Sequence, residues 1–226
     1  MKKFALIGNP LSHSISPLLH SSIFNQLGLD HSYELKELKK EDLESFVNRN
    51  RYYGYNVTIP YKKTIFNHIN EFENSCEDIG SVNCIFKGKG YNTDWKGFVL
   101  SLKKNDIDVS QKKCAIIGAG ATAKSIAYAL IELRCKSISI YNRTHENRIS
   151  LENWIRSKIK TYNTKNFDII INCTSLGMWP NVLESPMIKF ITSKDQIFYD
   201  VIYNPTKTKF LQEAQEIGAK TLNGMD

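Results

Sequence analysis

Lys62 and Asp94 are the residues of this chain whose types best suit proton transfer. Lys62 closes the segment Asn56-Val57-Thr58-Ile59-Pro60-Tyr61-Lys62, and Asp94 closes Asn92-Thr93-Asp94, a few residues after Ser81-Val82-Asn83-Cys84. A lysine and an aspartate that converge on a hydroxyl group or a ketone can exchange its proton while a hydride moves to a nicotinamide. A lone lysine is more often a surface residue and a lone aspartate a helix cap, so the prediction rests on their conjunction.

A second polar segment precedes a helix near the N-terminus. In Ser12-His13-Ser14-Ile15-Ser16-Pro17, the proline suits the first helical position, which makes Ser16 a candidate N-cap. On one interpretation these serines only cap the helix. On the other, Ser14 and Ser16 donate hydrogen bonds to a substrate carboxylate, aided by the helix dipole.

The segment Gly118-Ala119-Gly120-Ala121-Thr122-Ala123 has the spacing of a turn that binds a dinucleotide. It follows an apolar strand and opens a helix, which is the context that such a turn requires. Gly118 permits the tight turn, and Gly120 lets the backbone approach a pyrophosphate at the helix N-terminus. The alternative is a purely structural turn between a strand and a helix.

The end of the next strand bears on which dinucleotide binds. NAD calls for an Asp or Glu there, on the ribose 2′-hydroxyl, but this strand ends in Tyr141-Asn142-Arg143-Thr144. Arg143 can bind a 2′-phosphate and stack on the adenine, and Arg148 can assist from the helix that follows. The alternative is a solvated arginine at a strand end. The position of Arg143 after a glycine-rich turn favours NADP.

Short apolar strands alternate with helical patterns along the whole chain, which predicts an α/β protein with mainly parallel sheets. We expect strands at 4–8, 32–37, 53–57, 82–86, 114–117, 137–141, 167–172 and 196–201. We expect helices at 17–27, 40–48, 62–67, 94–104, 121–133 and 207–216, and a hairpin turn at 87–90. The domain boundary is expected near the helix at 94–104.

The composition is that of an ordinary globular protein, with 42% hydrophobic and 23% charged residues among 226. No apolar run reaches the ~18–20 residues that span a bilayer, and the N-terminus lacks the features of a secretory signal. Five cysteines without metal-type spacing are typical of reduced thiols. We therefore expect a cytoplasmic protein with no metal site and no membrane association.

The net charge of +7 can attract an anionic substrate or a phosphorylated cofactor, or it can reflect a lysine-rich proteome. The lysines are dispersed, and they are not interleaved with aromatic residues as in a groove for nucleic acid. We therefore expect a small-molecule substrate and no nucleic-acid partner.

Taken together, the motifs resemble the shikimate dehydrogenase (NADP+) family in order and spacing, from residue 4 to the end of the chain. In the first half they are Gly8-Asn9-Pro10, Ser14-x-Ser16-Pro17, Asn56-Val57-Thr58-x-Pro60-x-Lys62, Val82-Asn83 and Asn92-Thr93-Asp94. In the second half they are Gly118-Ala119-Gly120, Asn142-Arg143-Thr144, Ile171-Asn172-x-Thr174-Ser175-x-Gly177-Met178 and Tyr199-Asp200-x-x-Tyr203-x-Pro205. The Asn-Val-Thr-x-Pro-x-Lys and Asn-Thr-Asp motifs are specific, whereas the glycine-rich turn alone is not.

This resemblance implies a role for each residue of the two sites. Lys62 and Asp94 would be the catalytic pair, with Lys62 exchanging the proton and Asp94 orienting it and binding the adjacent hydroxyl group. The substrate would contact Ser14, Ser16, Asn56, Thr58, Asn83, Asp94 and Tyr203, with the two serines on its carboxylate. NADP would contact Gly118, Ala119, Gly120, Ala121, Thr122, Asn142, Arg143, Thr144, Arg148, Asn172, Thr174, Val201 and Gly224.

The resemblance also implies two α/β lobes and one reaction. Residues 1–97 would form the substrate-binding and catalytic domain, 98–217 a Rossmann-like NADP-binding domain, and 218–226 the start of a segment that returns to the first domain. The reaction would be the reversible NADPH-dependent reduction of 3-dehydroshikimate to shikimate, in chorismate and aromatic amino-acid biosynthesis, by a monomer or homodimer. Open alternatives are a quinate/shikimate dehydrogenase with broader cofactor use and a catalytically silent relative that binds NADP.

The chain departs from the family's pattern in three places. In the family, the stretch at 221–226 leads into a helix that returns to the first lobe and carries a glutamine on the substrate, so we expect this sequence to be cut short there. The segment between Arg143 and Asn172 is short for the family, as if one βα unit were trimmed. Asn74 stands where relatives often carry an acidic residue near the cofactor.

Overall fold

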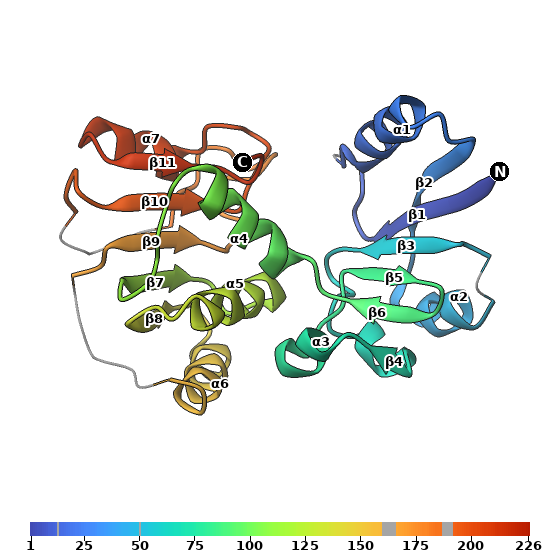
Figure 1. Cartoon of the computed structure of the whole chain (residues 1–226), viewed down its shortest axis with the longest axis horizontal. Helices are drawn as coiled ribbons and strands as arrows, with labels where there is room; N and C mark the ends of the chain where they lie inside the picture. The colour runs from blue at the N-terminus through green and yellow to red at the C-terminus, as the bar shows by residue number, and fades with distance from the viewer. Residues whose placement is uncertain (13, 50, 160–165, 187–191) are drawn as a thin grey trace. The chain divides into compact units, whose positions relative to one another are not determined.

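A computed structural model describes residues 1–12, 14–49, 51–159, 166–186 and 192–226 of the chain. The chain divides into two compact units, Met1–Asp94 and Trp95–Asp226, each built around one β-sheet (Figure 1). Strands and helices alternate in both units, so the predicted α/β class is confirmed. The functional domain limits at residues 97 and 217 stay predictions.

The first unit holds a mixed six-stranded sheet in the order β2-β1-β3-β5-β6-β4. The strands are β1 (Lys2–Gly8), β2 (His31–Glu37), β3 (Gly54–Val57), β4 (Glu71–Phe72), β5 (Cys84–Phe86) and β6 (Lys89–Tyr91). β1 lies parallel between β2 and β3, whereas β5 pairs antiparallel with both β3 and β6. Lys87 and Gly88 connect β5 to β6 with positive φ angles, which confirms the predicted hairpin.

Helices cover both faces of this sheet. They are α1 (Ser16–Gln26), α2 (Leu43–Arg49) and α3 (Asn74–Ile79), with 3-10 turns η1 (Lys40–Asp42) and η2 (Ile65–His68). Successive side chains of a strand point to opposite faces. Accordingly, Leu6 of β1 packs with Phe24 of α1, whereas Ala5 and Ile7 pack with Leu43 of α2. The alternation along β1 therefore places α1 on one face and α2 on the other.

The second unit holds a sheet of five parallel strands in the order β11-β10-β9-β7-β8. They are β7 (Lys113–Ile117), β8 (Ser137–Tyr141), β9 (Ile169–Asn172), β10 (Ile197–Asp200) and β11 (Lys220–Leu222). The chain passes from β7 to β8 on one side and then crosses to β9 on the other side of β7. A doubly wound sheet binds ligands at such a reversal, outside the carboxyl ends of its strands.

The described residues of this part of the fold form four helices: α4 (Asp94–Lys104), α5 (Ala121–Glu132), α6 (His145–Arg156) and α7 (Lys209–Glu216). Ile116 of β7 packs on one face with Leu130 of α5 and Leu151 of α6. Ala115, its neighbour in the chain, packs on the opposite face with Phe210 of α7. Both faces of the parallel sheet are therefore buried, as such sheets require.

The helix predicted at 62–67 is wrong. Residues 59–64 form turns, and only Ile65–His68 makes a 3-10 turn. The backbone N–H of Val82 donates a hydrogen bond of 2.8 Å to the carbonyl oxygen of Lys62. This carbonyl bonds to the strand region instead of to a helical partner four residues later, which accounts for the irregular backbone.

The prediction that Ser16 caps α1 is also wrong. The helix begins at Ser16 itself, and Ile15 occupies the cap position without a side-chain hydrogen bond. The hydroxyl oxygen of Ser14 instead accepts the backbone N–H of Ser16 at 3.2 Å. Ser14 therefore satisfies a donor at the helix start that has no partner within the helix.

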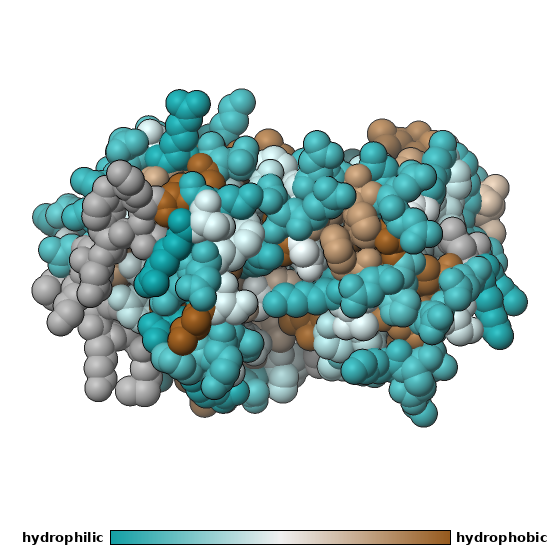
Figure 2. All heavy atoms as spheres, turned by 90° about the horizontal axis from the view of Figure 1, so that it is seen from below, coloured by the Kyte–Doolittle hydropathy of each residue, from teal (hydrophilic) through white to brown (hydrophobic). Residues whose placement is uncertain are grey.

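Among the described residues, no helix is long and apolar enough to cross a membrane. The longest, α5 and α6, have 12 residues each, against ~20 for a spanning helix. The face of the molecule drawn in Figure 2 is mostly hydrophilic, and hydrophobic residues show there in separate patches.

Candidate active site

Lys62 and Asp94 form an ion pair in the first unit. The Nζ atom of Lys62 lies 2.5 Å from the Oδ2 atom of Asp94, and the two side chains are 15% and 20% exposed. Because solvent screens a sheltered pair only weakly, the attraction between them is stronger than that of a surface salt bridge. The remaining exposure leaves both groups open to a ligand.

The backbone around Lys62 is anchored on both sides. The buried Tyr61 donates its hydroxyl hydrogen to the carbonyl oxygen of Leu38 at 2.5 Å. On the other side, the backbone N–H of Ile65 donates to the carbonyl oxygen of Tyr61 at 2.9 Å, and Ile65 is fully buried. The side chain of Lys62 therefore projects from a fixed base.

The carboxylate of Asp94 is oriented by its neighbours. Its Oδ1 atom accepts a hydrogen bond of 2.7 Å from Nδ2 of Asn83, which leaves Oδ2 to Lys62. The backbone N–H of Thr93 donates to Oδ1 of Asn83 at 2.8 Å, and that of Asp94 donates to Oδ1 of Asn92 at 3.2 Å. Because Asn83 and Asn92 are buried, they hold Asp94 in one orientation at the start of α4.

The two predicted serines lie together at the start of α1. The hydroxyl of Ser14 donates to that of Ser16 over 3.1 Å. Ser16 in turn hydrogen-bonds to the hydroxyl of Tyr33 on β2, which donates to Oδ1 of Asn56 at 2.8 Å. Tyr33 was missed in the sequence because a tyrosine on a strand is usually a core residue. The only sequence feature that could have pointed to Tyr33 is its position on β2, the strand that pairs with β1.

Hydrogen bonds link six of the predicted residues within the first unit: Ser14, Ser16, Asn56, Lys62, Asn83 and Asp94. Thr58, which follows β3, is half-buried and donates its N–H to the carbonyl oxygen of Ile7 at 2.9 Å. Tyr203 belongs to the second unit, where burial raises the pKa of its hydroxyl group. Its contact with the substrate stays a prediction.

The glycine-rich turn follows β7 as predicted and leads into α5. Gly118 has a φ of +112°, and a Cβ atom there would lie 3.0 Å from the carbonyl oxygen of Cys173, so both conformation and space require glycine. A Cβ atom at Gly120 would meet no atom within 4 Å. Packing within the chain therefore does not explain Gly120, and the open space beside the N-terminus of α5 fits a diphosphate.

The loop after β9 is held by buried hydrogen bonds. Oδ1 of Asn172 accepts the N–H of Thr174 at 3.0 Å and its hydroxyl at 2.7 Å. Nδ2 of Asn172 donates a hydrogen bond to Oδ1 of Asp200 at 3.2 Å. The carboxylate of Asp200 also accepts hydrogen bonds from the hydroxyl of Thr208 at 2.7 Å and from the backbone N–H of Ile202 at 3.0 Å. Burial raises the pKa of the Asp200 carboxyl group, which these hydrogen bonds partly offset. Asp200 was not predicted as a site residue.

The basic residues after β8 differ in their partners. Arg143 is exposed and makes no ion pair with any residue in the described part of the chain. Arg148 pairs with Glu152 at 3.3 Å and contacts His145 at 3.2 Å. Nδ2 of Asn142 donates to the carbonyl oxygen of Thr144 at 2.8 Å, which shapes the turn that carries Arg143. Arg143 is therefore free of an ion pair among the described residues and available to a phosphate.

Val201 and Gly224 pack directly on each other. A Cβ atom at Gly224 would lie 2.3 Å from the carbonyl oxygen of Val201, and the N–H of Gly224 donates to the carbonyl oxygen of Ile202 at 3.0 Å. Close packing accounts for glycine at this position. The predicted contact of both residues with NADP stays a prediction.

The fold and site define the class of protein. One unit offers a glycine-rich turn at the reversal point of a parallel sheet, and the other an oriented lysine–aspartate pair. Together these define an oxidoreductase that transfers hydride with a dinucleotide. In the described ranges, no group of three or more His, Cys, Asp or Glu side chains is placed to hold a metal ion.

Comparison with known proteins gives the family. Residues 6–85 match the shikimate dehydrogenase substrate binding domain, and residues 100–207 match shikimate / quinate 5-dehydrogenase. Shikimate dehydrogenase (NADP(+)) of Caldicellulosiruptor saccharolyticus is 39% identical over 243 residues, which cover 100% of this chain and 87% of the relative. The chain belongs to the shikimate dehydrogenase family.

Solved structures of the family superpose over the whole chain. A shikimate dehydrogenase in complex with NADP+ has a TM-score of 0.91 and 34% identity, with 100% of this chain and 85% of that chain covered. The enzyme of Thermus thermophilus, in complex with NADP(H) and shikimate, has a TM-score of 0.89 and 28% identity, with 100% and 88% covered.

Proposed function

We propose that this chain catalyses the reversible NADP-dependent oxidation of shikimate to 3-dehydroshikimate. The observation that carries the proposal is the pair of Lys62 and Asp94, joined at 2.5 Å and oriented by Asn83. It is supported by the relatives, which are named NADP(+) shikimate dehydrogenases, and by the relative solved with NADP(H) and shikimate.

The substrate binds to the first unit through its carboxylate and hydroxyl groups. When the substrate binds, the hydroxyls of Ser14 and Ser16 turn from their present acceptors and donate to the carboxylate beside the N-terminus of α1, where the helix dipole favours a negative charge. Asn56, Thr58 and Asn83 line the same site, and Tyr203 contributes from the second unit. The carboxylate of Asp94 accepts a hydrogen bond from the hydroxyl group next to the reacting carbon.

Lys62 handles the proton of the reaction. When bound, the nicotinamide of NADP accepts or supplies the hydride. In oxidation, the neutral amine of Lys62 accepts the proton of the reacting hydroxyl group and becomes an ammonium; in reduction, this ammonium donates the proton to the ketone oxygen. The negative charge of Asp94 holds the ammonium in place, so this group approaches the reacting oxygen in one orientation.

The second unit holds the cofactor. The diphosphate binds at the start of α5, in the open space at Gly120. It contacts the backbone of Gly118, Ala119, Ala121 and Thr122. Arg143 binds the 2′-phosphate, with Asn142, Thr144 and Arg148 around it. The remaining contacts come from Asn172, Thr174, Val201 and Gly224. The proposal includes a cytoplasmic enzyme that acts as a monomer or homodimer without a nucleic-acid partner.

Arg143→Ala is expected to raise KM for NADP by about tenfold to thirtyfold, the effect of one lost charge-assisted hydrogen bond. KM for NAD, which lacks the 2′-phosphate, changes less than twofold. The control is Arg156→Ala, which removes the same charge from the far end of α6, where Arg156 is 63% exposed. Steady-state kinetics with both cofactors decide it: an equal rise of KM for NADP and NAD contradicts the role of Arg143.

The proposed reaction is tested by kcat/KM for shikimate and quinate, each with NADP and with NAD. We expect shikimate with NADP to give the highest value. A preference for quinate or for NAD assigns the chain a different substrate or cofactor. No turnover with any combination, while NADP still binds, indicates a protein that binds the cofactor without catalysis.

A further inference from the structure

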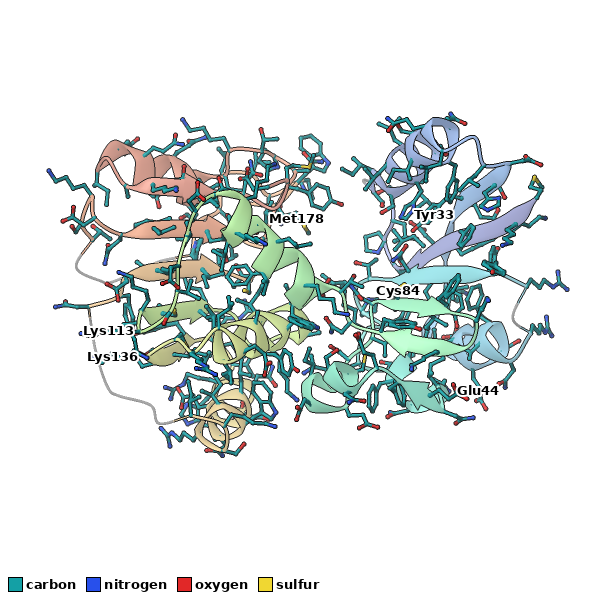
Figure 3. All side chains as sticks on the ribbon, in the orientation of Figure 1. Tyr33, Glu44, Cys84, Lys113, Lys136 and Met178 are labelled. Atoms are coloured by element: carbon teal, nitrogen blue, oxygen red, sulfur yellow. The ribbon has the colours of Figure 1, made fainter. Side chains whose placement is uncertain are left out.

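Tyr33 is a buried tyrosine of the first unit (Figure 3), and its hydroxyl group donates a hydrogen bond to Asn56. Its ring, on β2, stacks on the ring of His20 from α1, with centroids 4.0 Å apart and an angle of 5° between the planes. Phe24 of α1 also belongs to the apolar cluster around Tyr33. The ring is therefore clamped between the sheet and α1, and its hydroxyl oxygen has a fixed position.

The hydroxyl group of Tyr33 bonds on both sides to predicted substrate-binding residues. It donates to Oδ1 of Asn56 at 2.8 Å, and it accepts a hydrogen bond from the hydroxyl of Ser16. A phenol has one hydrogen to donate and lone pairs that accept, so the hydroxyl of Tyr33 can make both hydrogen bonds at the same time. Ser14 donates to Ser16 at 3.1 Å, so the donors run in one direction from Ser14 to Asn56.

The same chain of hydrogen bonds continues to the reacting groups. Nδ2 of Asn56 reaches the carbonyl oxygen of Asn83 at 3.5 Å, and Nδ2 of Asn83 donates to Asp94 at 2.7 Å. Asp94 is paired with Lys62. Tyr33 is thus the link between the two serines at the start of α1 and the side chains that lead to the catalytic pair.

A purely structural role would need only the ring of Tyr33. A phenylalanine would pack against His20 and Phe24 equally well, since the stacking and the apolar contacts do not involve the hydroxyl. The two hydrogen-bond partners of the hydroxyl are side chains that belong to the proposed substrate site. The hydroxyl group therefore has a task beyond packing.

We propose that Tyr33 is a positioning residue, whose hydroxyl group holds the side chain of Asn56 in the orientation that receives the substrate carboxylate. The proposal rests on the proposed function, because it acts through the same site. Asn56 has a short side chain with freedom to rotate, and a fixed partner lowers the entropy that it loses when the substrate binds.

Tyr33→Phe is expected to raise KM for shikimate about fivefold, with kcat within twofold of the wild type. This corresponds to about 1 kcal/mol, at 1.4 kcal/mol per tenfold, and is the usual net contribution of one hydrogen bond. A rise in KM at constant kcat is the sign of lost ground-state binding. KM for NADP stays unchanged, since the cofactor residues lie in the second unit.

Two controls separate positioning from general loosening of the fold. Tyr52→Phe removes another tyrosine hydroxyl of the same unit, one that bonds to Glu34, and leaves KM for shikimate unchanged. The second control is an analogue of shikimate in which a CH2OH group replaces the carboxylate, tested as a competitive inhibitor. Tyr33→Phe raises its inhibition constant less than twofold, whereas a general loosening weakens both ligands equally.

The double variant tests whether Tyr33 acts through Asn56. Asn56→Ala alone raises KM for shikimate, and adding Tyr33→Phe is expected to raise it less than twofold further. If Asn56→Ala raises KM but Tyr33→Phe does not, the role of Tyr33 is overturned while the proposed function stands. Equal weakening of shikimate and the alcohol analogue also overturns it. Failure of the wild-type chain to oxidise shikimate overturns both.

Discussion

Lys62→Ala lowers kcat by about 1,000-fold, within the range that a positioned proton donor and acceptor contributes. The substrate hydroxyl loses the group that takes its proton, and no other ammonium in the described part of the chain is paired with Asp94. Dissociation constants for shikimate and NADP change less than threefold, because the serines and the cofactor turn are untouched. Rapid kinetics for turnover and calorimetry for binding separate the two effects.

The matched control for this variant is the next residue in the chain. Lys63 is exposed, and Lys63→Ala removes the same charge from the same turn without touching Asp94. We expect its kcat to stay within twofold of the wild type. Lys62→Ala keeps the carbonyl that bonds to Val82, so the variant folds. Turnover near the wild-type rate in Lys62→Ala removes this lysine from the chemistry.

Asp200→Ala lowers the free energy of unfolding of the second unit by about 3 kcal/mol. It leaves three donors, on Asn172, Ile202 and Thr208, without their acceptor, each costing about 1–3 kcal/mol when buried. Loss of a buried carboxylate also relieves its desolvation, which keeps the net effect below the sum of the three. Urea unfolding measures it, with the exposed Asp195→Ala as a control that changes stability by less than about 0.5 kcal/mol.

Asp200→Asn isolates the charge of this residue. Burial raises the pKa of the Asp200 carboxyl above its value in the unfolded chain, which is about 4. The protonated form is thus favoured by folding, so the contribution of Asp200 is complete below about pH 4 and declines as pH rises through the raised pKa. The difference in stability between wild type and Asp200→Asn therefore falls over that window and then levels off. A difference that is constant with pH from 4 to 8 refutes this account.

Much of the fold could be predicted because its strands are apolar and its helices periodic. The buried runs of β7 and β9 and the helix at α5 were expected within one or two residues of their observed limits. The twelve-residue α6 was expected only as a helix that carries Arg148, without a predicted range. The other elements without a predicted range are short: α3 has six residues, β4 two, and β6 and β11 three each. Segments of this length carry too few residues for a periodic pattern, and their conformation depends on pairing with distant strands.

The candidate site was predictable where a residue acts through its own chemistry. Lys62 and Asp94 have charges that attract each other, and Gly118 needs a backbone that other residues avoid. Tyr33 and Asp200 act through partners far apart in the sequence, so only the fold shows what they do. Asp200 meets Asn172 28 positions away, and Tyr33 meets Asn56 23 positions away.

The most direct test of the proposed reaction follows the hydrogen that moves. Shikimate carrying deuterium at the carbon that becomes the ketone is incubated with NADP and the 226-residue chain. We predict one reduced cofactor for each 3-dehydroshikimate formed, with the deuterium on the nicotinamide, and formation of both products about 1,000-fold slower with Lys62→Ala. Absence of cofactor reduction by the wild-type chain, or deuterium released to water instead of transferred, contradicts a hydride transfer assisted by Lys62 and Asp94.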